Sequence, residues 1–220
     1  MTVRQDFFKV QDEIVTMNQN KTQHRSILVN SFSNFVEFSN KHFTLAKYLI
    51  KDERDVFYRI EKMMLWTMVI TIIIQLTIHL MPVWLAITLA ILLAQRVFEF
   101  VIVYARNFIF GRGRVFTDFK DAQQQGEWLI MMFSLNILQV LIIYSVWYRL
   151  LSILDPQAFL GKLTILNSLY FTVVSFLTVG YGDILPVSDF AKILVLTQGV
   201  LTFYTLVIVV NGLISIHFRK

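Results

Sequence analysis

Residues 178–183 read Thr-Val-Gly-Tyr-Gly-Asp, and this short stretch decides how the rest of the chain is understood. It follows an apolar segment, 163–177, and precedes a much longer one that begins near residue 190. Glycine adopts positive φ without steric cost, so Gly180 and Gly182 permit a backbone that alternates between conformations. The stretch is therefore expected to be a non-helical loop between two apolar segments.

The first half of the chain predicts a helical hairpin in a membrane. Residues 63–81 carry no charge and are about long enough for a helix to cross the ~30 Å hydrocarbon core. Pro82 follows, and a proline suits the start of a helix because its missing N–H would have no partner there. Residues 83–110 are again apolar and carry three charges. Met81 and Pro82 are expected at the tip of the hairpin.

Two further spans flank the 178–183 stretch. The third predicted span is 128–148, which has no charged residue, and the fourth is 190–216, which carries only Lys192. The segment 163–177 between them is too short to cross. The chain is thus expected to be an all-α membrane protein with four transmembrane helices.

The distribution of basic residues predicts the orientation. With the N-terminus inside, the cytoplasmic parts are 1–62, 106–127 and the tail after residue 216, and they hold 16 of the 20 Lys and Arg residues. This asymmetry follows the positive-inside rule. Both termini are expected in the cytoplasm of a multi-pass protein of the plasma membrane.

The composition excludes several other classes of protein. The chain is 56% hydrophobic and 16% charged, which is too apolar for an ordinary soluble domain. It has no cysteine, its four histidines lack ligand spacing, and no nucleophile lies beside a base, so neither an enzyme nor a cofactor is expected. The net charge of +5 is explained by membrane loops, and no nucleic-acid partner is expected.

The run at 178–183, preceded by a helix-length segment and flanked by two spans, resembles the selectivity filter of tetrameric potassium channels. The resemblance covers about 90 residues, from Trp128 to the C-terminus. It implies a re-entrant pore helix over roughly 166–177, followed by a filter loop, in each subunit of a homotetramer. The permeant ion would be K⁺, because backbone carbonyls can replace its water without the full charge that would trap it.

The resemblance also implies roles for individual residues. The backbone carbonyls of Thr178, Val179, Gly180 and Tyr181 would bind K⁺, with Gly182 completing the filter. Asp183 would lie at the outer mouth. The ring of Tyr181 would brace the filter against the pore helix, and Tyr170 and Phe171 resemble the aromatic pair that packs around it; the alternative is that both rings are interfacial aromatics.

The fourth span departs from the family pattern. Where many relatives have a hinge glycine, this chain has Thr202. Gly199 lies about one turn earlier, and Gly212 follows Asn211 near the cytoplasmic end. Each is a possible inner-helix hinge or a point of close helix packing, and packing is the preferred interpretation.

Charges elsewhere suggest two further contacts. Arg96 and Glu99 are three residues apart and can meet on one helix face inside the second span. A buried ion pair that fixes packing is the preferred interpretation, and coupling between hairpin and pore is the alternative. In the linker, Arg112 and Arg114 are expected to contact anionic lipid headgroups.

The predicted organisation has four parts: an N-terminal cytoplasmic helical region (1–62), a transmembrane hairpin (63–105), a cytoplasmic linker (106–127) and a potassium-channel pore domain (128–220). The N-terminal region is hypothesised to regulate the pore. Three alternatives to a selective channel remain: a channel that does not discriminate K⁺ from Na⁺, a potassium-uptake transporter, and a modulatory subunit that needs another pore-forming chain.

Overall fold

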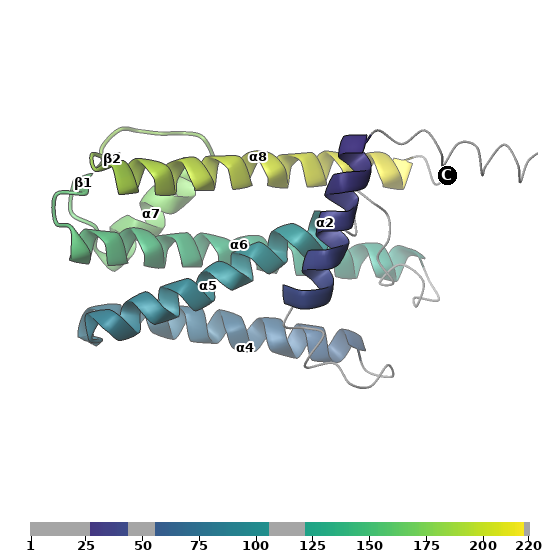
Figure 1. Cartoon of the computed structure of the whole chain (residues 1–220), viewed down its shortest axis with the longest axis horizontal. Helices are drawn as coiled ribbons and strands as arrows, with labels where there is room; N and C mark the ends of the chain where they lie inside the picture. Colours follow the sequence, from purple (N-terminus) through teal and green to yellow (C-terminus); the bar gives the residue numbers. More distant parts are fainter. Residues whose placement is uncertain (1–26, 44–55, 106–121, 218–220) are drawn as a thin grey trace, which may run out of the picture.

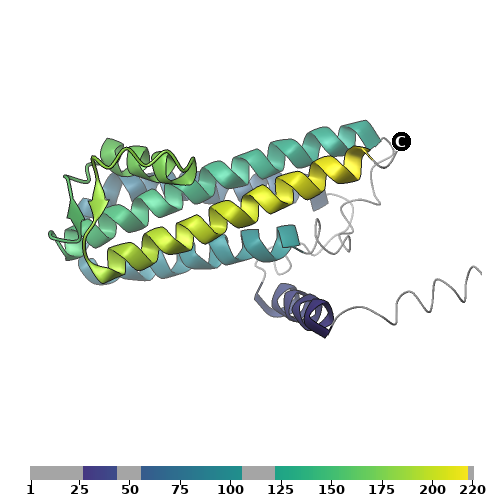
Figure 2. The same cartoon turned by 90° about the horizontal axis from the view of Figure 1, so that it is seen from above.

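The computed structural model describes residues 27–43, 56–105 and 122–217. Four long helices, α4 (Val56–Thr77), α5 (Val83–Tyr104), α6 (Ala122–Leu154) and α8 (Asp189–His217), run side by side along the long axis of the molecule (Figures 1 and 2). Each contains a segment that is long and apolar enough to cross a membrane. The four predicted spans are confirmed to this extent.

The hairpin turns where the sequence predicts. α4 continues into the single 3₁₀ turn η2 (Ile78–Leu80), and Pro82 caps the start of α5 with an extended backbone at φ −62°. The Pro82 carbonyl accepts hydrogen bonds from the amides of Leu85 and Ala86, at 3.0 and 3.1 Å. Proline suits the start of a helix, because the first N–H groups of a helix have no partner within it and proline has none to leave unpaired. α5 begins at the next residue, Val83.

α6 is longer than the predicted third span. It begins at Ala122, inside the predicted 106–127 linker, and continues through Leu154, six residues beyond Tyr148. Arg149, the first residue after the predicted third span, is therefore a helical residue, and only 9% of its surface is exposed. An arginine does not end a helix when its guanidinium finds partners inside the bundle, which Arg149 does.

Two further helices and two short strands complete the described part of the chain. α2 (Ile27–Phe43) crosses the bundle at a steep angle and buries Val36 in a cluster with Ile102 and Ala105 of the α5 end (Figure 1). α7 (Ile165–Phe176) lies between two-residue strands, β1 (Phe159–Leu160) and β2 (Leu185–Pro186), which pair antiparallel. Of the predicted N-terminal region 1–62, the structure describes 27–43 and 56–62.

The core lies between α5, α6, α7 and α8 and is rich in aromatic rings. Tyr148 of α6, fully buried, packs against Phe159 and Phe171 with ring centroids 5.7 and 5.0 Å apart. Edge-to-face pairs of this kind fill irregular spaces and favour one arrangement of the rings. The aromatic core thus fixes α7 against α6, close to the 178–183 loop.

Candidate functional site: the loop after α7

α7 covers all but the last residue of the segment predicted as a pore helix, 166–177, and is too short to cross a membrane. Its twelve residues rise about 18 Å, against the ~30 Å of a hydrocarbon core. The Thr164 hydroxyl caps its start by accepting from the Asn167 amide at 3.2 Å. The β1–β2 pairing brings the two ends of the 161–184 segment to the same end of the bundle (Figure 1).

The loop backbone alternates in conformation. Thr178, Gly180 and Gly182 have positive φ, at +57°, +58° and +78°, while Val179, Tyr181 and Asp183 do not. Glycine explains two of these angles, but Thr178 is a β-branched residue in a region that such residues avoid. Its hydroxyl donates to the Leu177 carbonyl at 2.7 Å, a local bond that helps to hold the turn.

The carbonyls of the loop differ from those of α7 in their hydrogen bonding. Where α7 ends, the amides of Thr178 and Val179 donate to the carbonyls of Ser175 and Val174, at 3.1 and 3.0 Å. Beyond that turn, within the described part of the chain, no carbonyl from 178 to 182 accepts a hydrogen bond from the backbone. Unpaired backbone carbonyls in an apolar environment need another partner, and a desolvated cation can be that partner.

The rings of Tyr170 and Tyr181 lie parallel, at a centroid distance of 6.5 Å. Tyr170 is also near Asp183: partial burial of Tyr170, together with the neighbouring Asp183 carboxylate, raises the pKa of Tyr170. α7 therefore meets the loop at both its middle and its end. Val179, 49% exposed, and Tyr181, 71% exposed, leave the rest of the loop open in a single chain.

Phe171 lies on a different side of α7 from Tyr170. It is buried against Tyr148 and Phe159, in the core between α6 and β1. Successive helical residues point about 100° apart, so two adjacent rings face different surroundings. Phe171 anchors α7, and Tyr170 contacts the loop.

A glycine that sequence reasoning missed secures the end of the loop. Gly161 follows β1 with φ +109°, and a Cβ there would stand 3.2 Å from the Ile184 side chain and 3.3 Å from the Asp183 carbonyl oxygen. The amides of Val187 and Ser188 donate to the Ala158 carbonyl, at 2.8 and 3.2 Å. A glycine directly after a short apolar strand is the signal that could have found it.

Polar residues inside the apolar helices were also missed. Gln75, Ser145 and Ser168 meet behind α7, and Gln198 of α8 donates to the Thr172 carbonyl at 2.7 Å. Gln198 also accepts a hydrogen bond from the Tyr148 hydroxyl. A scan for charges alone passes over such residues, although an uncharged amide in a membrane helix also needs partners.

The other predicted residues lie elsewhere. Gly199 is in the uninterrupted helix α8, and no atom lies within 4 Å of where its Cβ would stand. Gly212 falls within the bounds of α8, but its surroundings are outside the described residues, as are Arg112 and Arg114. Neither glycine is shown to be a hinge or a packing point.

The ion pair predicted in the second span is present. Arg96 Nη1 lies 2.6 Å from Glu99 Oε2, and 2% of the Glu99 side chain is exposed. Arg96 also reaches the Gln139 side-chain oxygen on α6, at 3.4 Å. The pair thus neutralises two charges inside the bundle and joins α5 to α6.

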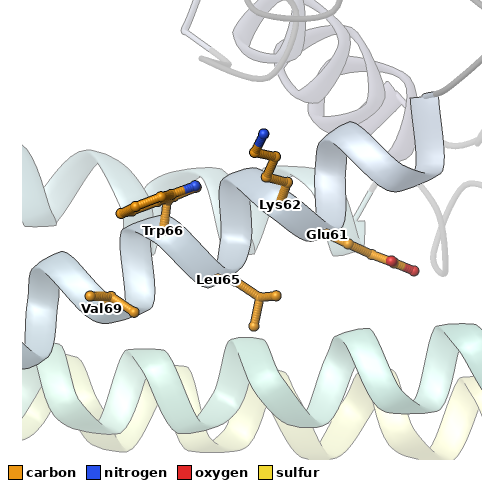
Figure 3. A pocket seen from close by; sticks show the side chains of 5 residues that line it. All are labelled: Glu61, Lys62, Leu65, Trp66 and Val69. Carbon is orange, nitrogen blue, oxygen red and sulfur yellow. The ribbon is translucent and has the colours of Figure 1, made fainter.

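A surface hollow on α4 lies away from the loop. It is lined by side chains of α4: Glu61, Lys62, Leu65, Trp66 and Val69 (Figure 3). Glu61 accepts a hydrogen bond from the Trp128 indole at 2.5 Å. Among the described residues, no three His, Cys, Asp or Glu side chains gather as metal ligands.

Comparison with known protein families identifies the segment that contains the loop. A family model described as an ion channel matches residues 131–219, which include most of α6, all of α7, the 178–183 loop and α8. No curated protein and no solved structure matches the chain. The family match supports an ion channel domain over these residues and ion conduction across a membrane. With the four apolar helices, it supports a protein embedded in a membrane.

Proposed function

We propose that this chain is the pore-forming subunit of a potassium-selective channel and conducts K⁺ passively down its electrochemical gradient. The observation that carries the proposal is the loop backbone: positive φ at alternate residues, with carbonyls that accept no backbone hydrogen bond among the described residues. Such a backbone supplies oxygen ligands without a full negative charge, as K⁺ binding and release require.

A single loop cannot surround an ion, so the proposed assembly is a homotetramer. The loop exposes Val179 and Tyr181 in the isolated chain, and α8 exposes large apolar side chains along its length, including Phe190, Val200 and Phe203. Cyclic closure by identical copies would cover such surfaces and bring four loops together on one axis. Four Asp183 carboxylates at the mouth would then concentrate cations.

The proposed orientation follows the basic residues. The protein lies in the plasma membrane with both termini in the cytoplasm. The segment formed by α7 and the loop enters the membrane from the outer side and returns to that side. In this arrangement the end of α7, with the negative end of its dipole, points toward the centre of the membrane, where it favours a cation. Lipid, K⁺ and identical subunits are the partners, no cofactor takes part, and the linker arginines Arg112 and Arg114 contact anionic headgroups.

The reversal potential tests the proposal. The purified chain is reconstituted in a planar bilayer with potassium on one side and sodium on the other. A potential far toward the potassium equilibrium value is expected. Current with a potential near zero would leave a channel without selectivity, and absence of current from a verified tetramer would favour a modulatory subunit.

The number of chains in the conducting particle provides a second test. Native mass measurement in a membrane mimetic is expected to give four copies. A conducting monomer would instead favour an arrangement of the transporter type and would overturn the fourfold pore.

A further inference from the structure

Gln75 of α4 joins three helices inside the bundle. Its side-chain amide donates to the Ser145 hydroxyl of α6 at 2.7 Å and to the Ser168 hydroxyl of α7 at 3.1 Å, and the two hydroxyls are 2.9 Å apart. All three residues are at most 3% exposed. The hairpin therefore touches the helix that ends at the 178–183 loop through one buried polar triad.

The hydrogen bonds of the triad are consistent with one arrangement of donors and acceptors. An amide nitrogen has two hydrogens, and each serine accepts one of them. The Ser168 hydroxyl donates to the Ile165 carbonyl of its own helix at 2.9 Å, so the hydrogen between the serines comes from Ser145. Ser168 then accepts two hydrogen bonds and donates one, which fixes its place relative to both α4 and α6.

The backbone of Gln75 is held as well. α4 ends two residues later, so the Gln75 carbonyl lacks a regular helical partner, and Arg149 of α6 donates to it. A cation at the C-terminal end of a helix also favours the helix dipole. Arg149 lies 3.3 Å from His79 Nδ1 in η2, which closes the contact between α6 and the hairpin tip.

If the triad served only to stabilise the fold, apolar side chains at the same three positions would serve about as well. The Gln75 side-chain oxygen is buried and has no hydrogen-bond partner among the described residues. Leaving a buried polar atom unpaired is costly, whereas apolar groups of the same shape at all three positions can be nearly neutral. What the polar triad adds is direction, because it fixes the position of α7 relative to the hairpin.

We propose that Gln75 is a positioning residue that couples the 63–105 hairpin to α7 and, through α7, to the ion-conducting loop. The coupling to conduction rests on the proposed channel function; the mechanical coupling does not. A displacement of α4 would pull on Ser168, and Tyr170, two residues further on the same helix, stacks on Tyr181 of the loop. The hairpin thus regulates the pore through the contact that Gln75 makes with α7.

The test compares Gln75→Leu and Ser168→Ala with a matched control, Thr71→Val. Thr71 is fully buried one turn earlier on α4, but its hydroxyl donates to Thr67 of the same helix at 2.7 Å. Two readouts are taken from each variant in nanodiscs or bilayers: hydrogen exchange of the 165–176 amides, and open probability with the permeability ratio of Na⁺ to K⁺.

Faster exchange in α7 is expected for Gln75→Leu and Ser168→Ala, with a change in open probability of about threefold, roughly what one hydrogen bond between membrane helices contributes. The double variant should add little to the larger single effect, and Thr71→Val should match the parent chain. Ser168→Ala removes a single oxygen, so it remains informative if Gln75→Leu fails to assemble.

Two outcomes overturn the coupling: exchange in α7 that is the same for all variants, or effects of Gln75→Leu and Ser168→Ala that add in full. Hydrogen exchange needs no current. If the parent chain proves silent in the bilayer, the proposed function fails, while exchange still decides whether Gln75 positions α7.

Discussion

The rings of Tyr170 and Tyr181 lie within 3° of parallel, so the helix before the loop and the loop itself contact each other through stacked aromatic faces. Stacked rings at this distance attract one another modestly. The contact joins a residue of α7, the helix that Phe171 anchors in the core, to one that lies between two glycines. α7 thus contacts the loop through these rings as well as through the continuous chain.

Only strongly alkaline pH is expected to weaken the contact between Tyr170 and Tyr181. Partial burial and the neighbouring Asp183 carboxylate raise the pKa of Tyr170 above the usual value of about 10. Because the folded-state pKa is the higher one, the contribution is fully present below about pH 10 and is lost as the pH rises through the raised pKa. Current should therefore be insensitive to outer pH between about 7 and 9 and fall only above about pH 10.

Two variants check the origin of this pH dependence. Tyr170→Phe keeps the ring but should lose the alkaline step, and Asp183→Asn should move the step to lower pH because the carboxylate no longer raises the pKa. An identical alkaline step in Tyr170→Phe would assign it to another group.

Gly180→Ala is expected to abolish selective conduction while the chain still folds. The φ of +58° disfavours alanine by about 1–2 kcal/mol, and nothing lies within 4 Å of the added methyl group, so the strain is confined to the backbone. The matched control is Gly199→Ala, in helix α8 with equally open surroundings. Reversal potentials under potassium and sodium should differ sharply between the two, and an unchanged value for Gly180→Ala would contradict the role of the loop.

Gly161→Ala should disturb the end of the loop, at Asp183 and Ile184. The added methyl group would press on Ile184 and the Asp183 carbonyl, and the positive φ of 109° adds strain of about 1–3 kcal/mol. We expect lower thermal stability of the assembly and a lower current per channel. Lys162→Ala, at the exposed neighbouring position, provides the control, and equal behaviour of the two variants would rule out the proposed constraint.

Removing one partner of the Arg96–Glu99 ion pair should destabilise the protein more than replacing both partners with apolar residues. Glu99→Gln leaves the arginine without its carboxylate inside the bundle, and single removals of this kind cost about 3–5 kcal/mol. The double variant Arg96→Met with Glu99→Leu should be clearly less destabilised in equilibrium unfolding. If its loss equals the sum of the two single losses, the pair is not coupled.

The spans and the loop could be predicted from the sequence because each depends on local chemistry. A run without charge either crosses a membrane or is buried, and a proline limits where the next helix begins, so the hairpin turn at Met81 and Pro82 followed directly. The two glycines likewise indicated an alternating backbone. The positive φ of Thr178 did not follow, because a β-branched residue adopts it only when its surroundings impose it.

Which helix faces which was decided by tertiary structure alone. Thr71 and Gln75 are both buried polar residues, one turn apart on α4; the first donates to its own helix, and the second to serines 70 and 93 residues away in the chain. A short hydroxyl can return to the carbonyl of the preceding turn, whereas a longer amide depends on what is packed beside it. The sequence by itself determined that both residues lie in an uncharged span, and the packing of α4, α6 and α7 decided that Gln75 would find its partners, Ser145 and Ser168, on the two neighbouring helices.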